Sequence, residues 1–227
     1  LNELMVYSRE LDKTTAPCVC ASAPALRGNA AGKLVLGADG MEQYNFFVAD
    51  EVRKFDKVPG LRGQYAALRN LHDLEALRGQ LKHYSICSDL RGWSSEFDLP
   101  RPLPATIEPN SRRAFTLPMC AEPTDRGLEL IVQVVVEKKE HLPAVGVSFN
   151  ESSACFDANA TNELLFPNGP SRHHLSKYQA YNYRFNASQI VEGWNEFVIF
   201  NRCDKVSSQS ESCDNSIKIV SIELAVR

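Results

Sequence analysis

The sequence contains no long run of apolar residues and no excess of charge of either sign. A helix that crosses a bilayer needs roughly 20 consecutive apolar residues, so we expect no membrane span. The 25 Lys and Arg residues are balanced by 28 Asp and Glu residues, and the net charge is -3. Because no basic stripe is present to neutralise phosphates, nucleic acid is a poor partner.

Motifs that bind metals or cofactors are also scarce. Cys18-x-Cys20 is half of a zinc-site pattern, but no second Cys or His pair with ligand spacing accompanies it. The Asp39-Gly40 turn follows a predicted helix and precedes a predicted strand, which is the wrong order for anion binding at a helix N-terminus. We therefore expect no cofactor, and zinc at Cys18 and Cys20 stays as a minor alternative.

The amino end has neither an initiator methionine nor the apolar stretch of a signal peptide. We expect the chain to be processed or cut from a longer precursor. Its 227 residues, 44% of them hydrophobic, are enough to bury one large core or two modest ones.

The sequence does have seven cysteines and three acceptor patterns for N-glycosylation, at Asn150, Asn159 and Asn186. Cys203 and Cys213 flank a polar segment between two strand-like runs, so we predict a disulfide between them. The odd number of cysteines leaves one thiol free or bonded to another chain. Together these features predict a secreted, extracellular glycoprotein.

The first 85 residues or so predict the order strand, helix, strand, helix, over residues 4–7, 24–36, 41–46 and 65–81. Gly28 and Gly32 weaken the first helix but allow it to approach a sheet closely. Asp73 is the expected N-cap for the final part of the second helix.

The sequence pattern changes after this segment. Prolines at 100, 102, 104 and 109 exclude a helix or a central strand, so we expect an extended connector here. Beyond it, apolar residues alternate with period two in six segments separated by turn residues. They are 114–117, 128–136, 145–149, 181–185, 195–200 and 217–226. Short strands without intervening helices predict an antiparallel β-sandwich.

Several stretches resemble a known family. The segments 102–109 (PLPATIEP), 191–201 (VEGWNEFVIFN) and 217–227 (IKIVSIELAVR) are similar to the terminal β-sandwich of glycoside hydrolases that have a TIM-barrel catalytic domain. In the same family a turn and strand similar to 37–47 (GADGMEQYNFF) form the last barrel strand, and an element similar to 77–84 (LRGQLKHY) closes the final helix.

The resemblance implies an α/β plus all-β fold. Residues 1–88 would be the last βα units of a (β/α)8 barrel, 89–109 a Pro-rich connector, and 110–227 a jelly-roll-like antiparallel β-sandwich. A quarter of a barrel leaves both its sheet edges unpaired. The remaining strands are then expected in another chain or in a missing precursor segment. Alternatively, the amino half packs on the sandwich as a small α+β layer.

The resemblance also implies a secreted glycoside hydrolase-like protein that acts on or binds carbohydrate, with catalysis incomplete within this chain. Barrel enzymes place their carboxyl groups after the strands, and Glu10 is the candidate here, although a solvated loop glutamate is the competing interpretation. Tyr44, Asn45 and Trp194 are the candidate sugar contacts. The other hypothesis is a non-catalytic structural or interaction glycoprotein, and Glu42, where the family pattern prefers an apolar or aromatic residue, favours it.

Overall fold

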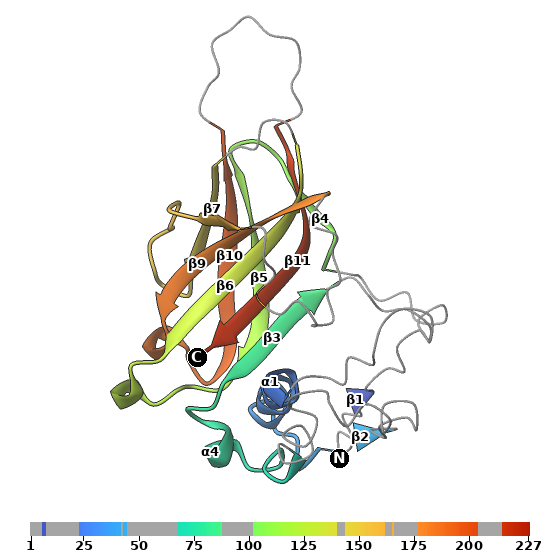
Figure 1. Ribbon diagram of the computed structural model, residues 1–227, viewed down its shortest axis with the longest axis vertical. Coiled ribbons are helices and arrows are strands. Elements are labelled where there is room, and N and C mark those ends of the chain that lie inside the picture. Colours follow the sequence, from blue (N-terminus) through green and yellow to red (C-terminus); the bar gives the residue numbers. More distant parts are fainter. Residues whose placement is uncertain are drawn as a thin grey trace, which may run out of the picture.

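The computed structural model is described over residues 6–7, 23–41, 43–44, 68–87, 102–139, 144–161, 165, 177–203 and 215–227. Two antiparallel sheets face each other, and a helix lies beside them next to a short parallel strand pair (Figure 1). No helix in the described part of the chain is long and apolar enough to cross a membrane.

The smaller sheet has three antiparallel strands. In spatial order they are β5 (Ser111–Met119), β10 (Gly193–Arg202) and β7 (Ala144–Phe149). Along β10 burial alternates from residue to residue, so that Asn195, Phe197 and Ile199 point into the core and the residues between them point outward. This is the period-two pattern that the sequence predicted for the segment.

The larger sheet has six strands and is built around the carboxy-terminal strand. Its order is β3 (Lys82–Cys87), β11 (Ile217–Val226), β6 (Glu129–Glu137), β9 (Tyr178–Asn186) and β8 (Asn159–Thr161), and β4 (Ala105–Ile107) also pairs with β11. All of these pairings are antiparallel. The six segments predicted as strands are thereby confirmed as β5, β6, β7, β9, β10 and β11.

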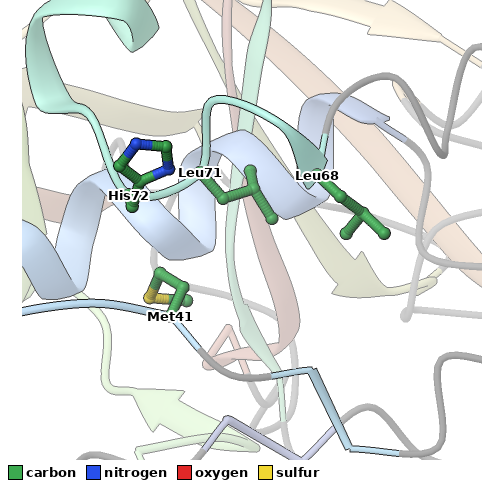
Figure 2. Close-up of a pocket in the computed structure, with 4 residues that line it drawn as sticks. All are labelled: Met41, Leu68, Leu71 and His72. Carbon is green, nitrogen blue, oxygen red and sulfur yellow. The ribbon is translucent and has the colours of Figure 1, made fainter.

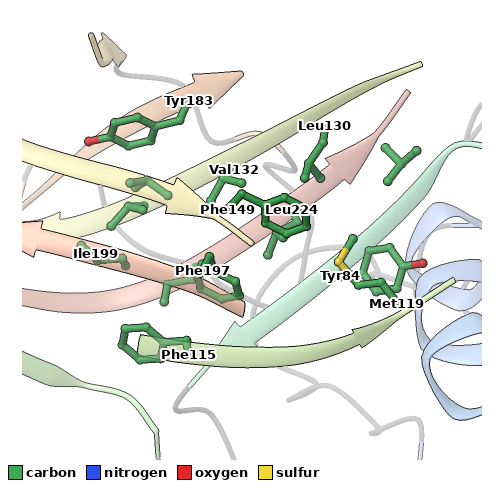
Figure 3. Packing of buried hydrophobic residues seen from close by; sticks show 14 of the residues in the cluster. Tyr84, Phe115, Met119, Leu130, Val132, Phe149, Tyr183, Phe197, Ile199 and Leu224 are labelled. Carbon is green, nitrogen blue, oxygen red and sulfur yellow. The ribbon is translucent and has the colours of Figure 1, made fainter. Parts of the chain in front are cut away.

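Aliphatic and aromatic side chains together fill the space between the two sheets (Figure 3). Phe115 stacks on Phe197 with ring centroids 5.8 Å apart. The hydroxyl of Tyr183, on the larger sheet, donates to the carbonyl oxygen of Val145, on the smaller one, over 2.7 Å. Each buried aromatic ring removes about 150–250 Å² of surface from water.

Helix α1 (Ala23–Leu34) packs against one edge of each sheet. A Cβ atom at Gly28 would lie 2.1 Å from the carbonyl oxygen of His83 on β3, and one at Gly32 would lie 2.9 Å from the carbonyl oxygen of Pro118 on β5. Only glycine permits this approach at Gly28, because the atom that it would meet belongs to the backbone. The predicted helix and the role of its two glycines are confirmed.

In the second predicted helical zone, the described residues are mostly not helical. Asp73 does cap a helix, since its carboxylate accepts hydrogen bonds from the N–H groups of Glu75 and Ala76 at 3.0 and 3.2 Å. That helix, α4 (Leu74–Leu77), has only four residues. The segment 77–84, expected to close a final barrel helix, instead leads into strand β3. Two short 3-10 helices, η1 (Thr124–Arg126) and η2 (Ala187–Gln189), complete the described elements.

The prediction of a TIM-barrel segment is wrong. The described strands lie mostly in antiparallel sheets, and no barrel-like helices accompany them. Strands β1 (Val6–Tyr7) and β2 (Gln43–Tyr44) do pair in parallel, but over two residues only. The decisive strand is β3, which pairs with β11 in the sandwich because the long β11 needs partners on both edges. The expected partner chain that would supply the remaining barrel strands depended on this prediction, and we no longer expect it.

Candidate ligand-binding surface

The structure does not test the predicted site residues of the amino half. Glu10 and Asn45 lie outside the described residues. Tyr44 is on β2, opposite Tyr7 of β1, and its side chain is not described. The catalytic role of Glu10 and the sugar contacts of Tyr44 and Asn45 therefore stay predictions.

Trp194, the remaining predicted contact, is the second residue of β10 and is 59% exposed. It follows Gly193, whose φ of +93° suits glycine in a turn. Val191, two residues before that glycine, is 50% exposed. The turn from Val191 to Trp194 thus presents two large apolar side chains to solvent.

A buried amide fixes this turn from the inside. Asn195 is fully buried, and its Nδ2 donates to the carbonyl oxygens of Val191 and Gly193 at 2.8 and 2.9 Å. Its Oδ1 accepts from the N–H of Val191 and from Nδ2 of Asn150, both at 2.9 Å. Four hydrogen bonds from one side chain hold the backbone of the turn in one conformation.

A second set of contacts fixes the turn from the other side. Both terminal nitrogens of Arg78 donate to the carboxylate of Glu192 at 3.1 and 3.0 Å, and the N–H of Ala121 donates to it at 2.8 Å. Burial raises the pKa of Glu192, but the hydrogen bonds from Arg78 and Ala121 outweigh burial, and the pKa lies below its usual value. Trp194 is therefore held on a rigid support although its ring is exposed.

Trp194 begins a row of outward-pointing side chains on β10, which we call the β10 face. In chain order the row is Trp194, Glu196, Val198, Phe200 and Arg202. On the neighbouring strand β5, Thr116 and Ala114 lie opposite Glu196 and Val198. Since both of these β5 residues are small and exposed, the row stays open to solvent along that side.

The far end of the β10 face combines aromatic rings with guanidinium groups. The rings of Phe156 and Phe200 are 6.2 Å apart, and Phe156 lies over Gly146, where a Cβ would be 2.5 Å from its ring. The guanidinium of Arg202 stacks on Phe156, 4.2 Å from its centroid. Arg112 lies opposite Phe200 on β5.

A buried ion pair near α4 is structural. Nζ of Lys82 lies 2.7 Å from Oε1 of Glu122, and both side chains are completely buried. Lys82 also donates to the carbonyl oxygen of Gln80 at 3.2 Å, and Glu122 accepts from the N–H of Gly79 at 2.7 Å. These contacts tie the turn after α4 to the end of β5, and they satisfy the two charges inside the protein.

The thiol beside this pair is not a nucleophile. Cys120 is buried and contacts the hydroxyl of Tyr84 at 3.7 Å and the carboxylate of Glu122 at 3.5 Å. Burial, the largest cause, raises the pKa of this thiol to about 11. It is protonated at neutral pH, whereas nucleophilic cysteines need a thiolate.

A second buried acid–base contact lies on the larger sheet. Nε2 of His83, on β3, is 3.5 Å from Oε2 of Glu223, on β11, and both side chains are buried. On the next strand Gln133 lies opposite Glu223 and donates to Asn182 at 2.8 Å. These residues form a polar row across the larger sheet.

A small cavity of about 220 Å³ lies away from both of these groups. It is lined by Met41, which follows α1, and by Leu68, Leu71 and His72, which precede α4 (Figure 2). Its volume is below the range of about 300–1,000 Å³ that is usual for small-molecule sites. Within the described ranges, no group of three His, Cys, Asp or Glu side chains could hold a metal ion.

No protein-family model and no curated protein matches this chain. The resemblance to glycoside hydrolases therefore depends on the quoted motifs alone.

Only one residue of the β10 face was predicted from the sequence. The other four, Glu196, Val198, Phe200 and Arg202, were missed, as was Arg112 on β5, although the segment 195–200 was correctly predicted as a strand. The signal that could have found the β10 residues is their spacing of two from Trp194, which places them on the same side of the strand. Arg112 needs the register of β5, which the sequence does not reveal.

Only one of the two predicted disulfide partners lies among the described residues. Cys203 follows β10, and its N–H donates to Oδ1 of Asn110 at 3.1 Å, but Cys213 lies outside the described residues. Their disulfide stays a prediction. Cys120 and Cys155 form no disulfide.

The three predicted glycosylation sites differ in their surroundings. The Nδ2 of Asn150, the atom that would carry a glycan, donates to the carbonyl oxygen of Gln189 and to Oδ1 of Asn195 at 2.7 and 2.9 Å. Asn186 is exposed, and its oxygen rather than its nitrogen caps η2, by accepting from the N–H of Ser188 at 2.9 Å. Asn159 is on β8, and its side chain is not described.

When the protein is secreted from a eukaryotic cell, we expect it to carry a glycan at Asn186 and none at Asn150. Linkage at Asn150 would replace one of two amide hydrogens that are both in use, and so break a hydrogen bond to Gln189 or to Asn195. Glycopeptide mass spectrometry of the folded, secreted protein measures both positions, and the Asn186→Gln variant is the control for peptide assignment. Substantial occupancy of Asn150 in folded protein would contradict this expectation.

Proposed function

We propose that this chain is a non-catalytic carbohydrate-binding protein whose ligand lies on the β10 face, with Trp194 as the platform on which a sugar ring stacks. The observation that carries the proposal is an exposed indole on a turn that is fixed from both sides by Asn195 and Glu192. Because the turn is already ordered, binding there costs little conformational entropy.

The chemistry of the β10 face suits a sugar better than a purely apolar partner. A pyranose ring has an apolar face of C–H groups, which packs on an aromatic ring, and an edge of hydroxyl groups, which needs polar partners. Next to Trp194 on this face, Glu196 and Thr116 are exposed and lie opposite each other on β10 and β5. They supply a hydrogen-bond acceptor and a hydroxyl group beside the stacking platform.

We further propose that the protein is secreted or extracellular. Three N-glycosylation patterns and seven cysteines support this. The alternative function, a structural or interaction glycoprotein that binds no carbohydrate, is the outcome if the following test fails.

Trp194→Ala is expected to weaken polysaccharide binding by about thirtyfold or more, since truncation of a central aromatic contact commonly costs about 2 kcal/mol. Affinity electrophoresis against a panel of soluble polysaccharides, followed by calorimetry on those that retard the protein, measures the effect. Because the ring is exposed, the variant is expected to unfold at the temperature of the unsubstituted protein.

The matched control is Leu36→Ala, which removes a large apolar side chain that is 41% exposed in the turn after α1. It is expected to leave binding unchanged. Equal binding by the Trp194→Ala variant, or no binding by the unsubstituted protein to any polysaccharide, would contradict the proposed function.

A further inference from the structure

The exposed carboxylate of Glu196 has uncharged neighbours on its side of the smaller sheet. Along β10, the outward residues before and after it are Trp194 and Val198. Across the sheet, Thr116 lies opposite it on β5. On its other side lies Asn150, whose N–H donates to the carbonyl oxygen of Glu196 at 2.7 Å. None of these neighbours compensates the negative charge of Glu196.

The other carboxylate near Trp194 is already neutralised. Glu192 accepts hydrogen bonds from both terminal nitrogens of Arg78 at 3.1 and 3.0 Å. The Nε of Arg78 donates to Glu75 at 2.9 Å, so this guanidinium is shared between two carboxylates and is not directed at Glu196. The charge that a ligand on Trp194 meets beside the indole is therefore that of Glu196.

An indole and a carboxylate on one surface together favour a cation. The face of an indole attracts positive charge, and a carboxylate forms charge-assisted hydrogen bonds with an ammonium group. Residues two apart on one side of a strand are about 7 Å apart, so a ligand stacked on Trp194 brings its substituents toward Glu196. The net charge of -3 attracts a cationic ligand at longer range.

We propose that the ligand is a sugar chain that contains protonated amino sugars, with a sugar ring on Trp194 and its ammonium group at Glu196. The hydroxyl of Thr116, opposite Glu196, can then form a hydrogen bond with a hydroxyl group of the same sugar. Neutral and acidic sugars bring no positive charge to this carboxylate. The inference rests on the proposed function, because it names the kind of sugar that the same face binds.

The test compares two oligosaccharides that have the same linkage and length and differ only at C2. Calorimetry with a β-1,4-linked glucosamine pentamer and with cellopentaose, at mildly acidic pH where the amino groups are protonated, measures the contribution of the ammonium group. The unsubstituted protein is expected to bind the glucosamine pentamer about fivefold or more tighter, from an exposed cation–π contact and an exposed ion pair together. This preference is expected to decline as sodium chloride is raised.

Glutamate variants locate the effect. Glu196→Gln is expected to abolish the preference for the glucosamine pentamer. Glu108→Gln is the matched control, because it removes the same charge from an exposed glutamate that precedes β5, at the end of that strand far from Trp194. It is expected to keep the preference, and thermal unfolding checks that the variants are folded. A lysine pentamer carries the same charge without sugar rings, and it is expected to bind more weakly than the glucosamine pentamer.

The outcomes separate the two proposals. A preference for the glucosamine pentamer that requires both Trp194 and Glu196 supports the inference. Equal or tighter binding of cellopentaose that still requires Trp194 overturns the inference and leaves the proposed function standing. A preference retained in the Glu196→Gln variant overturns the inference, as does a lysine pentamer that binds as tightly as the glucosamine pentamer. Binding of sugars that is absent or independent of Trp194 overturns both proposals.

Discussion

Lys82→Met is expected to lower the free energy of unfolding by about 3–5 kcal/mol, which is the usual cost of breaking a buried ion pair by removing one partner. The carboxylate of Glu122 would keep the hydrogen bond from Gly79 but lose the positive charge 2.7 Å away. Since the Glu122 side chain is completely buried, water cannot replace the lost partner. Urea or guanidinium unfolding measures the change as a shift of the midpoint at constant slope.

Two controls distinguish this cost from a general effect of losing a lysine. Lys218→Met removes the partner of Glu137 in an ion pair whose side chains are each 43% exposed, and it is expected to cost less than about 1 kcal/mol. The double variant Lys82→Met with Glu122→Leu leaves no buried charge and is expected to recover much of the lost stability. A Lys82→Met variant as stable as the Lys218→Met variant would show that the buried pair is not needed.

This ion pair also explains why strand β3 was missed in the sequence. Lys82 and His83 are polar residues at the start of a segment that ends in Ile86 and Cys87. Without their partners they look like the polar end of a helix. The partners, Glu122 and Glu223, lie 40 residues or more away in the chain, and no local pattern predicts a contact over that separation.

The parts that could be predicted are those set by local chemistry. Apolar and polar residues alternate in 195–200, which predicts a strand with one buried side. Asp73, before α4, has a side chain that is favoured at the N-cap of a helix. Gly28 and Gly32 indicated that their helix approaches a sheet closely, but not which strands it meets. Pairing in a sheet joins distant segments, so the three-stranded sheet and the partners of β11 could not be derived from the strands themselves.

The candidate site was predicted in part for the same reason. Trp194 is conspicuous, because a large aromatic residue follows a turn glycine. The opposition of Arg112 and Phe200 depends on a strand register that only the folded chain defines. The barrel resemblance directed attention to Glu10 and Asn45, which lie outside the described residues.

Asn195→Asp is expected to cost about 2–4 kcal/mol at neutral pH although the two side chains have nearly the same shape. The amide nitrogen of Asn195 donates to the carbonyl oxygens of Val191 and Gly193. An ionised carboxylate has no hydrogen to donate, so it would place negative charge against two acceptors in a site closed to water. The loss is therefore expected to exceed that of the exposed Val191→Ala, which removes a side chain of the same turn.

The pH dependence of the Asn195→Asp variant makes the explanation testable. Its protonated carboxyl group can donate one hydrogen bond, so folding favours the protonated form and raises the pKa above the value of about 3.9 for an unfolded chain. The difference in unfolding free energy from the unsubstituted protein should be smallest below that value, where one of the two donated hydrogen bonds is kept, and grow as pH rises through the folded-state pKa. Sugar binding at neutral pH should also fall, because Trp194 depends on this turn for its position. A difference that does not change with pH would show that shape, not hydrogen bonding, sets the role of Asn195.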